Sequence, residues 1–205
     1  HAQAIGDIPS AELVGGSCRT EAKGRKFADE FNCRWYDDFT QMYDAEKPDV
    51  VNICTPSGAH LEPTLAAVER GIHVLSEKPL EVNLERARQM IDAASAAGVK
   101  LGGIFPQRFN PVVRTVFDAA QASRFGPLAM AVAYVPWWRE DDYYSPDRWQ
   151  GTAALDGGGA MINQSIHAID AIQWIAAAAD AGEVEQVFAY TGKCGHDSSL
   201  IEVED

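Results

Sequence analysis

The chain has 205 residues, of which 46% are hydrophobic and 23% are charged, a composition typical of an ordinary globular protein. Its 30 acidic and 17 basic residues give a formal net charge of −13, which argues against nucleic acid or an anionic membrane surface as a partner. No apolar run approaches the roughly 18 residues of a transmembrane candidate, and the N-terminus carries no signal-peptide pattern, so we expect a cytoplasmic protein.

Short strand-like segments alternate with helical patterns in the first half of the chain. The strand-like segments cover residues 11–17, 49–55, 73–77 and 99–105. The helical patterns cover residues 22–31, 60–71 and 83–98, with Asn83 as a plausible N-cap and Gly98 as the stop of the last one. This alternation predicts a parallel, doubly wound α/β sheet, which binds ligands beyond the carboxyl ends of its strands.

The pattern changes after residue 105, so we predict one domain over residues 1–105 and a second over residues 106–205. A helical pattern near residues 110–122 opens the second domain, and strand-like runs follow at residues 127–138 and 184–192. Helices followed by widely spaced strands predict an α+β domain. The four cysteines are scattered and form no C-x-x-C pair, which favours reduced structural thiols, and we predict no metal site.

The helix that follows the three glycines at 157–159 carries a polar stripe beside its isoleucines. At 100° per residue, the stripe contains Asn163, His167, Asp170 and Trp174. A lone helical histidine is more often a core residue than a ligand. Here Asn163 and His167 are spaced so that both can reach one small molecule, and the glycines let backbone or a ligand approach the first turn.

The segment before this helix, "WWREDDYYSPDRW", is unusually dense in aromatic and charged residues for a loop. We regard it as a candidate ligand wall, because aromatic rings and arginine forks both bind small polar molecules. The alternative is a contact between domains or subunits. The candidate wall residues are Trp137, Trp138, Arg139, Tyr143 and Tyr144.

Hydroxyl-bearing and polar residues follow the strand-like segment 49–55. Thr55, Pro56, Ser57 and His60 stand between this strand and a helix N-terminus, where hydroxyls and free N–H groups can hold ribose or phosphate. The alternative is a plain turn in which Ser57 caps the helix.

The next strand-like segment ends in "SEKPL", which places Lys78 between Glu77 and Pro79. A lysine at such an edge is commonly just solvated. The proline nevertheless fixes the turn, and we predict a cis Lys78–Pro79 peptide bond. Gln107 and Arg108 close a third strand end.

Taken together, these motifs resemble those of the Gfo/Idh/MocA oxidoreductases. The resemblance runs end to end through "CTPSGAH", "EKP", "QRFNP", the "WW…YY…W" loop and "DGGGAMINQSIHAID". It is strongest toward the branch that includes UDP-N-acetyl-sugar 3-dehydrogenases and similar sugar or cyclitol dehydrogenases. It implies a Rossmann domain for NAD(P), and a second α/β domain that binds substrate and builds homo-oligomers through its sheet.

The resemblance also implies roles for particular residues. Lys78 would contact substrate and nicotinamide, and His167 would be the acid/base; Arg139, Tyr143 and Tyr144 would join them at the substrate. Many relatives carry Asp where this chain has Asn163, and an amide can orient a hydroxyl but cannot take its proton. The expected cofactor contacts are Ser17, Arg19, Thr55, Pro56, Ser57, His60, Glu77, Lys78, Pro79 and Gln107.

A second departure from the family pattern is that no G-x-G-x-x-G occurs in the 205 residues. We therefore expect the pyrophosphate loop to lie upstream of His1. The closing "IEVED" reads as the start of a strand, so we interpret the sequence as an internal piece of a longer protein. The Rossmann-like sheet would then lack its first strand, and the second domain would be truncated.

The cofactor preference is read from the end of the segment 11–17. Rossmann domains usually place there an acidic residue that binds the ribose hydroxyls. This chain has Cys18 instead, followed by Arg19, with Ser17 close by. An arginine fork beside hydroxyls suits a 2′-phosphate, so we predict a preference for NADP over NAD; the alternative is that Arg19 is a solvated surface charge.

The function that follows is an NAD(P)-dependent oxidoreductase that acts on a secondary alcohol of a sugar, sugar nucleotide or cyclitol. Two alternatives remain open at this point. One is an NAD-dependent glycosidase of the same fold, which would keep the same lysine and histidine. The other is a regulator that senses NAD(P) without catalysis.

Overall fold

The computed structural model describes residues 1–197 and 199–205, which form two compact units. Unit 1 comprises residues 1–55, 59–77 and 84–102. Unit 2 comprises residues 56–58, 78–83 and 103–205. The turns that follow two strands of unit 1 therefore belong to unit 2, and one of these turns carries Lys78.

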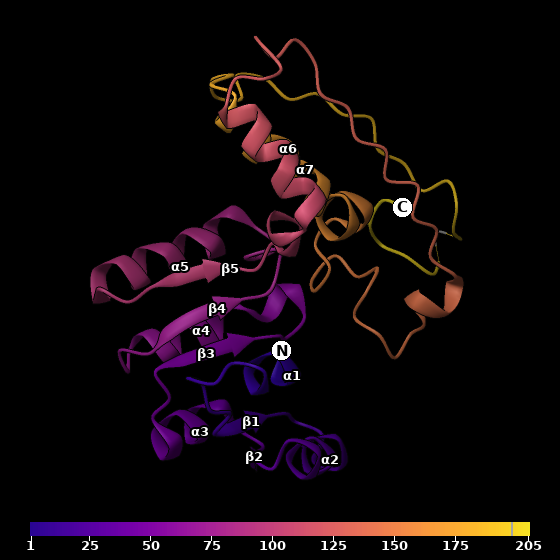
Figure 1. The fold of residues 1–205 in the computed structure, drawn as a ribbon. Helices are drawn as coiled ribbons and strands as arrows, with labels where there is room; N and C mark the ends of the chain where they lie inside the picture. Colours follow the sequence, from indigo (N-terminus) through magenta and orange to yellow (C-terminus); the bar gives the residue numbers. More distant parts are fainter. Residues whose placement is uncertain (198) are drawn as a thin grey trace. The chain divides into compact units, whose positions relative to one another are not determined.

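Unit 1 is an α/β unit built on two parallel sheets (Figure 1). In the smaller sheet, β1 (Gly15–Ser17) pairs in parallel with β2 (Arg34–Tyr36). The larger sheet has the order β3 (Val50–Ile53), β4 (His73–Ser76) and β5 (Leu101–Gly103), and β3 pairs in parallel with β4. The parallel α/β architecture predicted from the alternating pattern is confirmed.

Helices connect the strands of unit 1. They are α1 (Ala2–Gly6), α2 (Glu21–Phe31), α3 (Phe39–Glu46), α4 (Leu61–Val68) and α5 (Leu84–Ala97). The predicted helices at 22–31, 60–71 and 83–98 correspond to α2, α4 and α5. Gly98 ends α5 with a φ of +69°, a left-handed conformation that glycine adopts without a steric penalty.

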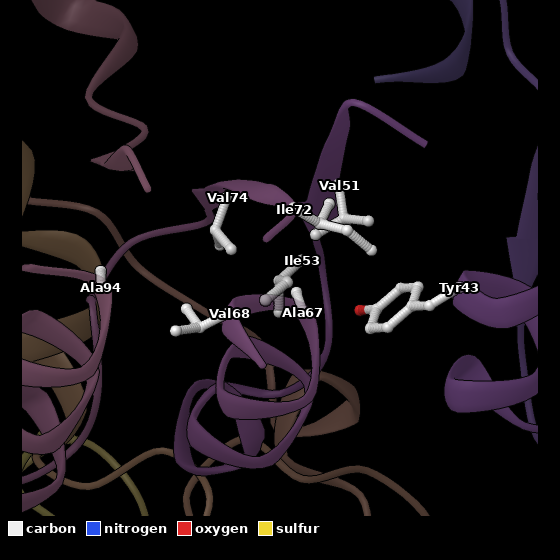
Figure 2. Close-up of a cluster of buried hydrophobic side chains, with 8 residues drawn as sticks. All are labelled: Tyr43, Val51, Ile53, Ala67, Val68, Ile72, Val74 and Ala94. Atoms are coloured by element: carbon white, nitrogen blue, oxygen red, sulfur yellow. The ribbon is translucent and has the colours of Figure 1, made fainter. Parts of the chain in front are cut away.

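The core of unit 1 lies between the larger sheet and its helices (Figure 2). Val51 and Ile53 alternate along β3, so both side chains point to the same face of the sheet. They pack in one cluster with Ala67 of α4 and Tyr43 of α3. This packing fixes β3 and β4 against the helices, and their carboxyl ends lead into turns that carry predicted site residues.

Three elements of unit 1 were not predicted from the sequence, namely α1, β2 and α3. The strand β2 has three residues, too few to show a period of two. The helix α3 did carry a signal, because Asp38 is its N-cap and accepts hydrogen bonds from Thr40 N at 2.7 Å and Gln41 N at 3.0 Å.

Unit 2 is built around two helices that lie side by side (Figure 1). The helix α6 (Pro111–Gln121) begins at Asn110, whose side chain accepts a hydrogen bond from Val112 N at 2.9 Å. It packs against α7 (Ile166–Ala178), and the rings of Phe117 and Trp174 stack with centroids 3.9 Å apart. Short helical turns complete the unit: η1 (Ser57–Ala59, of which only the first two residues belong to this unit), η2 (Pro106–Phe109), η3 (Asp141–Tyr144) and η4 (Ala160–Gln164), a π-helical turn.

The strands predicted at residues 127–138 and 184–192 are absent, so that expectation was wrong. Both runs are extended without any assigned strand in Figure 1. Their side chains face solvent, as Tyr134, Val187 and Tyr190 show with exposed fractions of 88, 91 and 93%. A β-rich composition favours extended backbone, but a strand forms only where a neighbour completes its ladder of hydrogen bonds.

Within the part of the chain described, no helix is long and apolar enough to cross a membrane.

Candidate active site

Lys78 is held against the start of the glycine-rich helical run. Its Nζ donates to the backbone carbonyl of Asn163 at 2.6 Å and to the side-chain Oδ1 of Asn163 at 2.9 Å, although the residues are 85 positions apart. The peptide bond between Lys78 and Pro79 is cis, as predicted. Pro79 is buried and Lys78 is half-buried, so the ammonium is placed by the turn and by Asn163 together.

A third residue, Asp156, completes this arrangement and was missed by the sequence analysis. Its Oδ1 accepts from Asn163 Nδ2 at 2.7 Å, and its Oδ2 accepts from Gly151 N at 2.8 Å. Asp156 is 1% exposed, and this burial raises the pKa of its carboxyl group, while the two hydrogen bonds oppose the shift. The available signal was its position immediately before the three glycines.

The partners of Asn163 explain why the chain has an amide at this position. Its oxygen faces the Lys78 ammonium and its NH₂ group faces the Asp156 carboxylate, so an amide satisfies both neighbours at once. A carboxylate at position 163 would stand beside that of Asp156, and two adjacent carboxylates repel each other. The Asn at position 163, where many relatives carry Asp, therefore fits the neighbouring Asp156 carboxylate.

The glycines at 157–159 allow close approach of this chain's own residues. Gly159 has a φ of +46°, and a Cβ there would lie 1.9 Å from the carbonyl oxygen of Glu204. Gly157 has a φ of +83°, and a Cβ there would lie 2.4 Å from Cβ of Val82. The sequence allowed either backbone or a ligand to approach these glycines. In the structure, residues of the chain itself approach Gly157 and Gly159 closely.

His167 lies in the first turn of α7, four residues after Asn163, and is half-buried. The other members of the polar stripe are engaged within unit 2. Asp170 accepts two hydrogen bonds from Arg108, at 2.8 and 2.5 Å, and this pairing raises the pKa of Arg108. Trp174 stacks on Phe117. The part of the stripe that contacts Lys78 is Asn163, and His167 follows it by one helical turn.

The predicted cofactor residues of the first βα turn are exposed in unit 1. Ser17 ends β1 and Arg19 follows it, just before α2 begins at Glu21. Within the described ranges, the Arg19 guanidinium has no carboxylate or ring partner. The backbone carbonyl of Cys18 accepts a hydrogen bond from Trp35 Nε1 at 3.0 Å, which fixes this turn. Such a turn leaves a positive group at the carboxyl end of a parallel strand.

The turn after β3 carries Thr55 and His60, which the sequence predicted as cofactor contacts. His60 is 1% exposed, with Nε2 at 2.9 Å from the carbonyl of Thr55 and Nδ1 at 3.3 Å from Ser76 Oγ. The ring is therefore buried with both nitrogens engaged, and its role as a cofactor contact stays a prediction. Thr55 is exposed, and its hydroxyl donates to the carbonyl of Ala59 at 2.8 Å.

Pro56, Ser57 and Gly58 belong to unit 2. Gly58 N donates to the carbonyl of Leu155 at 2.9 Å, next to Asp156. Ser57 is 3% exposed, and α4 has no side-chain cap, so Ser57 neither caps that helix nor faces solvent. This turn supports the backbone that precedes the three glycines.

Five further predicted residues lie at other places. Glu77 accepts from the His1 ring at 2.9 Å in unit 1, and Gln107 is half-buried in η2 of unit 2. In the aromatic loop, the Arg139 guanidinium lies over the rings of Trp137 and Tyr143, at 5.7 and 5.3 Å from their centroids. Tyr144 contacts Tyr143 edge to face and is 7% exposed.

Comparison with known proteins places both halves of the chain. Residues 1–104 match the oxidoreductase family with an NAD-binding Rossmann fold, and residues 113–205 match the GFO/IDH/MocA C-terminal domain. The chain is 31% identical to D-glucoside 3-dehydrogenase of Escherichia coli K12 over 80% of its own length and 46% of that protein. It is 27% identical to D-xylose 1-dehydrogenase (NADP(+)) 2 of Haloferax volcanii over 92% of its own length and 56% of that protein.

A solved structure covers the whole chain. The WlbA dehydrogenase from Bordetella pertussis, in complex with NADH and UDP-GlcNAcA, superposes with a TM-score of 0.91 at 32% identity. The match covers 100% of this chain and 57% of that protein. The chain thus spans about half the length of the relatives that it matches.

Proposed function

Because the chain belongs to the Gfo/Idh/MocA oxidoreductase family, we propose that the protein containing it transfers a hydride between NAD(P) and a secondary alcohol. The alcohol belongs to a sugar, a sugar nucleotide or a cyclitol. Its relatives include D-glucoside 3-dehydrogenase, 1,5-anhydro-D-fructose reductase and inositol 2-dehydrogenase 4, and a WlbA dehydrogenase similar to the chain forms a complex with NADH and UDP-GlcNAcA. The observation that supports the proposal best is the placement of the Lys78 ammonium on Asn163, in the helical run that carries His167.

The residues divide the chemistry between them. A nicotinamide cofactor, when bound, would supply the hydride-accepting chemistry. His167 accepts the hydroxyl proton, and the Lys78 ammonium stabilises the negative charge that develops on that oxygen. Asn163 cannot exchange a proton; it positions Lys78, and Asp156 holds its amide in the required orientation.

This proposal is tested with the complete reading frame that contains the chain. The purified protein is mixed with NAD or NADP and a panel of sugars, sugar nucleotides and inositols, and cofactor reduction is followed by absorbance. We expect reduction with at least one cyclic polyol. Binding of NAD(P) without reduction by any panel member would contradict the proposal and favour a sensor. Cleavage of glycosides without added cofactor would favour the glycosidase.

The exposed cation after β1 supports a preference for NADP. The residues at this turn fit a 2′-phosphate, because Arg19 offers a planar fork and Ser17 a hydroxyl, and no acid stands between them. We predict that Arg19→Ala lowers the affinity for NADP by about tenfold or more, since a charged hydrogen bond contributes roughly 1.5–3 kcal/mol. The affinity for NAD should change little. Fluorescence titration with both cofactors provides the measurement.

Lys26→Ala is the matched control, because Lys26 is exposed on α2 and its removal changes the net charge equally. Equal losses of NADP affinity in the two variants would show that the effect is long-range charge alone. A parent protein that uses NAD as efficiently as NADP would also contradict the assignment.

We further propose that unit 2 mediates self-association. The two extended runs expose large apolar side chains: Met130 is 78% exposed, Val187 91% and Phe188 82%. Exposed apolar groups at unpaired extended backbone favour pairing with another chain.

A further inference from the structure

A buried glycine stands inside α2, at position 24. Glycine weakens a helix relative to alanine, so a glycine inside a helix usually has a packing reason. Here the reason comes from β2. A Cβ at position 24 would lie 1.9 Å from Nε1 of Trp35, so Gly24 leaves room for the indole directly against the helix backbone. The elements that carry this contact, α2 and β2, lie together with β1 in unit 1 (Figure 1).

The indole that packs on Gly24 reaches the turn after β1. Its Nε1 donates a hydrogen bond to the Cys18 carbonyl at 3.0 Å, across 17 positions of sequence. The N–H of Cys18 donates to the carbonyl of Tyr36, also at 3.0 Å. Both backbone groups of Cys18 are therefore bonded to β2, one through the backbone and one through a side chain. Because β1 ends at Ser17, the indole extends the hold of β2 beyond the last paired residue.

The residue that follows this fixed carbonyl is Arg19, which is exposed. The Cys18 carbonyl and the Arg19 N–H belong to one planar peptide unit. A hydrogen bond that orients this carbonyl therefore also orients the chain as it enters Arg19. Trp35 thus acts on the backbone from which the Arg19 guanidinium extends.

The indole also contacts a pair of charges at the start of α2. The Arg25 guanidinium lies 5.4 Å from the centroid of the Trp35 ring, and Arg25 Nε donates to Glu21 Oε1 at 2.8 Å. Both charged side chains are exposed, so the pair itself contributes little to stability. Glu21 nevertheless stands only two residues after Arg19, and its pairing with Arg25 reduces its repulsion of a phosphate at this turn.

We propose that Trp35 is a positioning residue for the contact of Arg19 with the 2′-phosphate of NADP. The inference rests on the cofactor preference proposed above, and it makes that preference depend on β2 and α2 as well as on the turn itself. A charged hydrogen bond weakens when its geometry is lost. Loosening the turn should therefore affect NADP, which carries the phosphate, more than NAD.

The test is calorimetric titration of the complete protein with NADP and with NAD. Trp35→Phe keeps an aromatic ring against Gly24 but removes the N–H donor. We expect the ratio of NADP affinity to NAD affinity to fall about three- to tenfold, the size of one neutral hydrogen bond. Tyr36→Phe is the matched control, because it removes from the same strand a hydroxyl that donates to Glu46 of α3. It should leave the ratio unchanged.

A double variant separates positioning from a general packing role. If Trp35 acts through Arg19, Trp35→Phe should lower the affinity ratio of the parent but cause no further decrease in the Arg19→Ala protein. Additive decreases in the double variant would overturn the inference. An unchanged ratio in a folded Trp35→Phe protein would overturn it as well.

Gly24→Ala tests the same contact from the side of the helix. Its methyl group would take the place of the indole nitrogen, so the ring must move and the Cys18 carbonyl loses its donor. The affinity ratio should fall as it does in Trp35→Phe. Thermal unfolding identifies which of the two variants is folded, and an unchanged ratio in either folded variant contradicts the role of Trp35.

The parent protein separates a failure of this inference from a failure of the cofactor assignment. A parent that binds NADP no more tightly than NAD would overturn both. A parent that prefers NADP, and loses this preference in Arg19→Ala but keeps it in Trp35→Phe, would overturn the role of Trp35 alone.

Discussion

Replacing His167 by alanine is expected to lower kcat by about 10²–10⁴ in the complete protein, the usual contribution of a positioned general acid or base. The reason is that Asn163 cannot exchange a proton and Lys78 is held as an ammonium donor on Asn163, so His167 remains to accept the hydroxyl proton. Steady-state kinetics with the best substrate of the panel, together with thermal unfolding of the variant, provide the measurement.

Gln173→Ala is the matched control, because Gln173 is exposed on the same helix. It should leave both kcat and the unfolding temperature near those of the parent. A His167→Ala protein that folds normally and retains kcat within about threefold would rule out a general-base role of the size proposed. If the variant lost activity and also unfolded at a clearly lower temperature than the parent, the result would point instead to a packing role of His167.

Substitution of Lys78 by methionine is expected to lower kcat/KM by about 10²–10³, the loss seen when one preorganised donor to a developing oxyanion is removed. Methionine keeps the unbranched stem of the side chain but donates no hydrogen bond. Both oxygens of Asn163 that accept from Lys78 lose their donor. The loss should fall mainly on kcat, because the ammonium acts on charge that develops in the transition state.

Lys100→Met serves as the control for removal of a surface lysine, since Lys100 is exposed in unit 1. It should not change kcat. If Lys78→Met raised KM alone and left kcat unchanged, Lys78 would be a ground-state binding residue and the oxyanion role would be wrong.

Asn163 shows how a departure from a family pattern can be explained by its neighbours. From the sequence, the replacement of Asp by Asn meant only the loss of a proton acceptor. In the structure, the amide joins a cation to a buried carboxylate: it donates to Asp156 while accepting from Lys78, which a carboxylate cannot do. Asp156 therefore belongs to the candidate site as a positioning residue.

Local sequence determined the parallel α/β unit and several of its details. The alternation of β-rich runs with amphipathic helices predicted the strands and connecting helices of unit 1, because each element buries a face with its own period. The end of α5 at Gly98 and the cis bond before Pro79 were also predicted correctly, because each depends on the residue at that position. Lys78, Asn163 and His167 were predicted as site residues from the same kind of local motif, and their roles stay predictions.

Tertiary structure decided what depends on a distant partner. The contact of Lys78 with Asn163 spans 85 positions, and Asp156 became visible as a site residue only through its hydrogen bonds. The burial of His60, with its ring nitrogens near the Thr55 carbonyl and the Ser76 hydroxyl, was likewise not visible in the sequence. The runs at 127–138 and 184–192 have strand-like composition but no strand, because a strand requires a neighbour whose backbone completes the hydrogen bonds, and local sequence does not supply one.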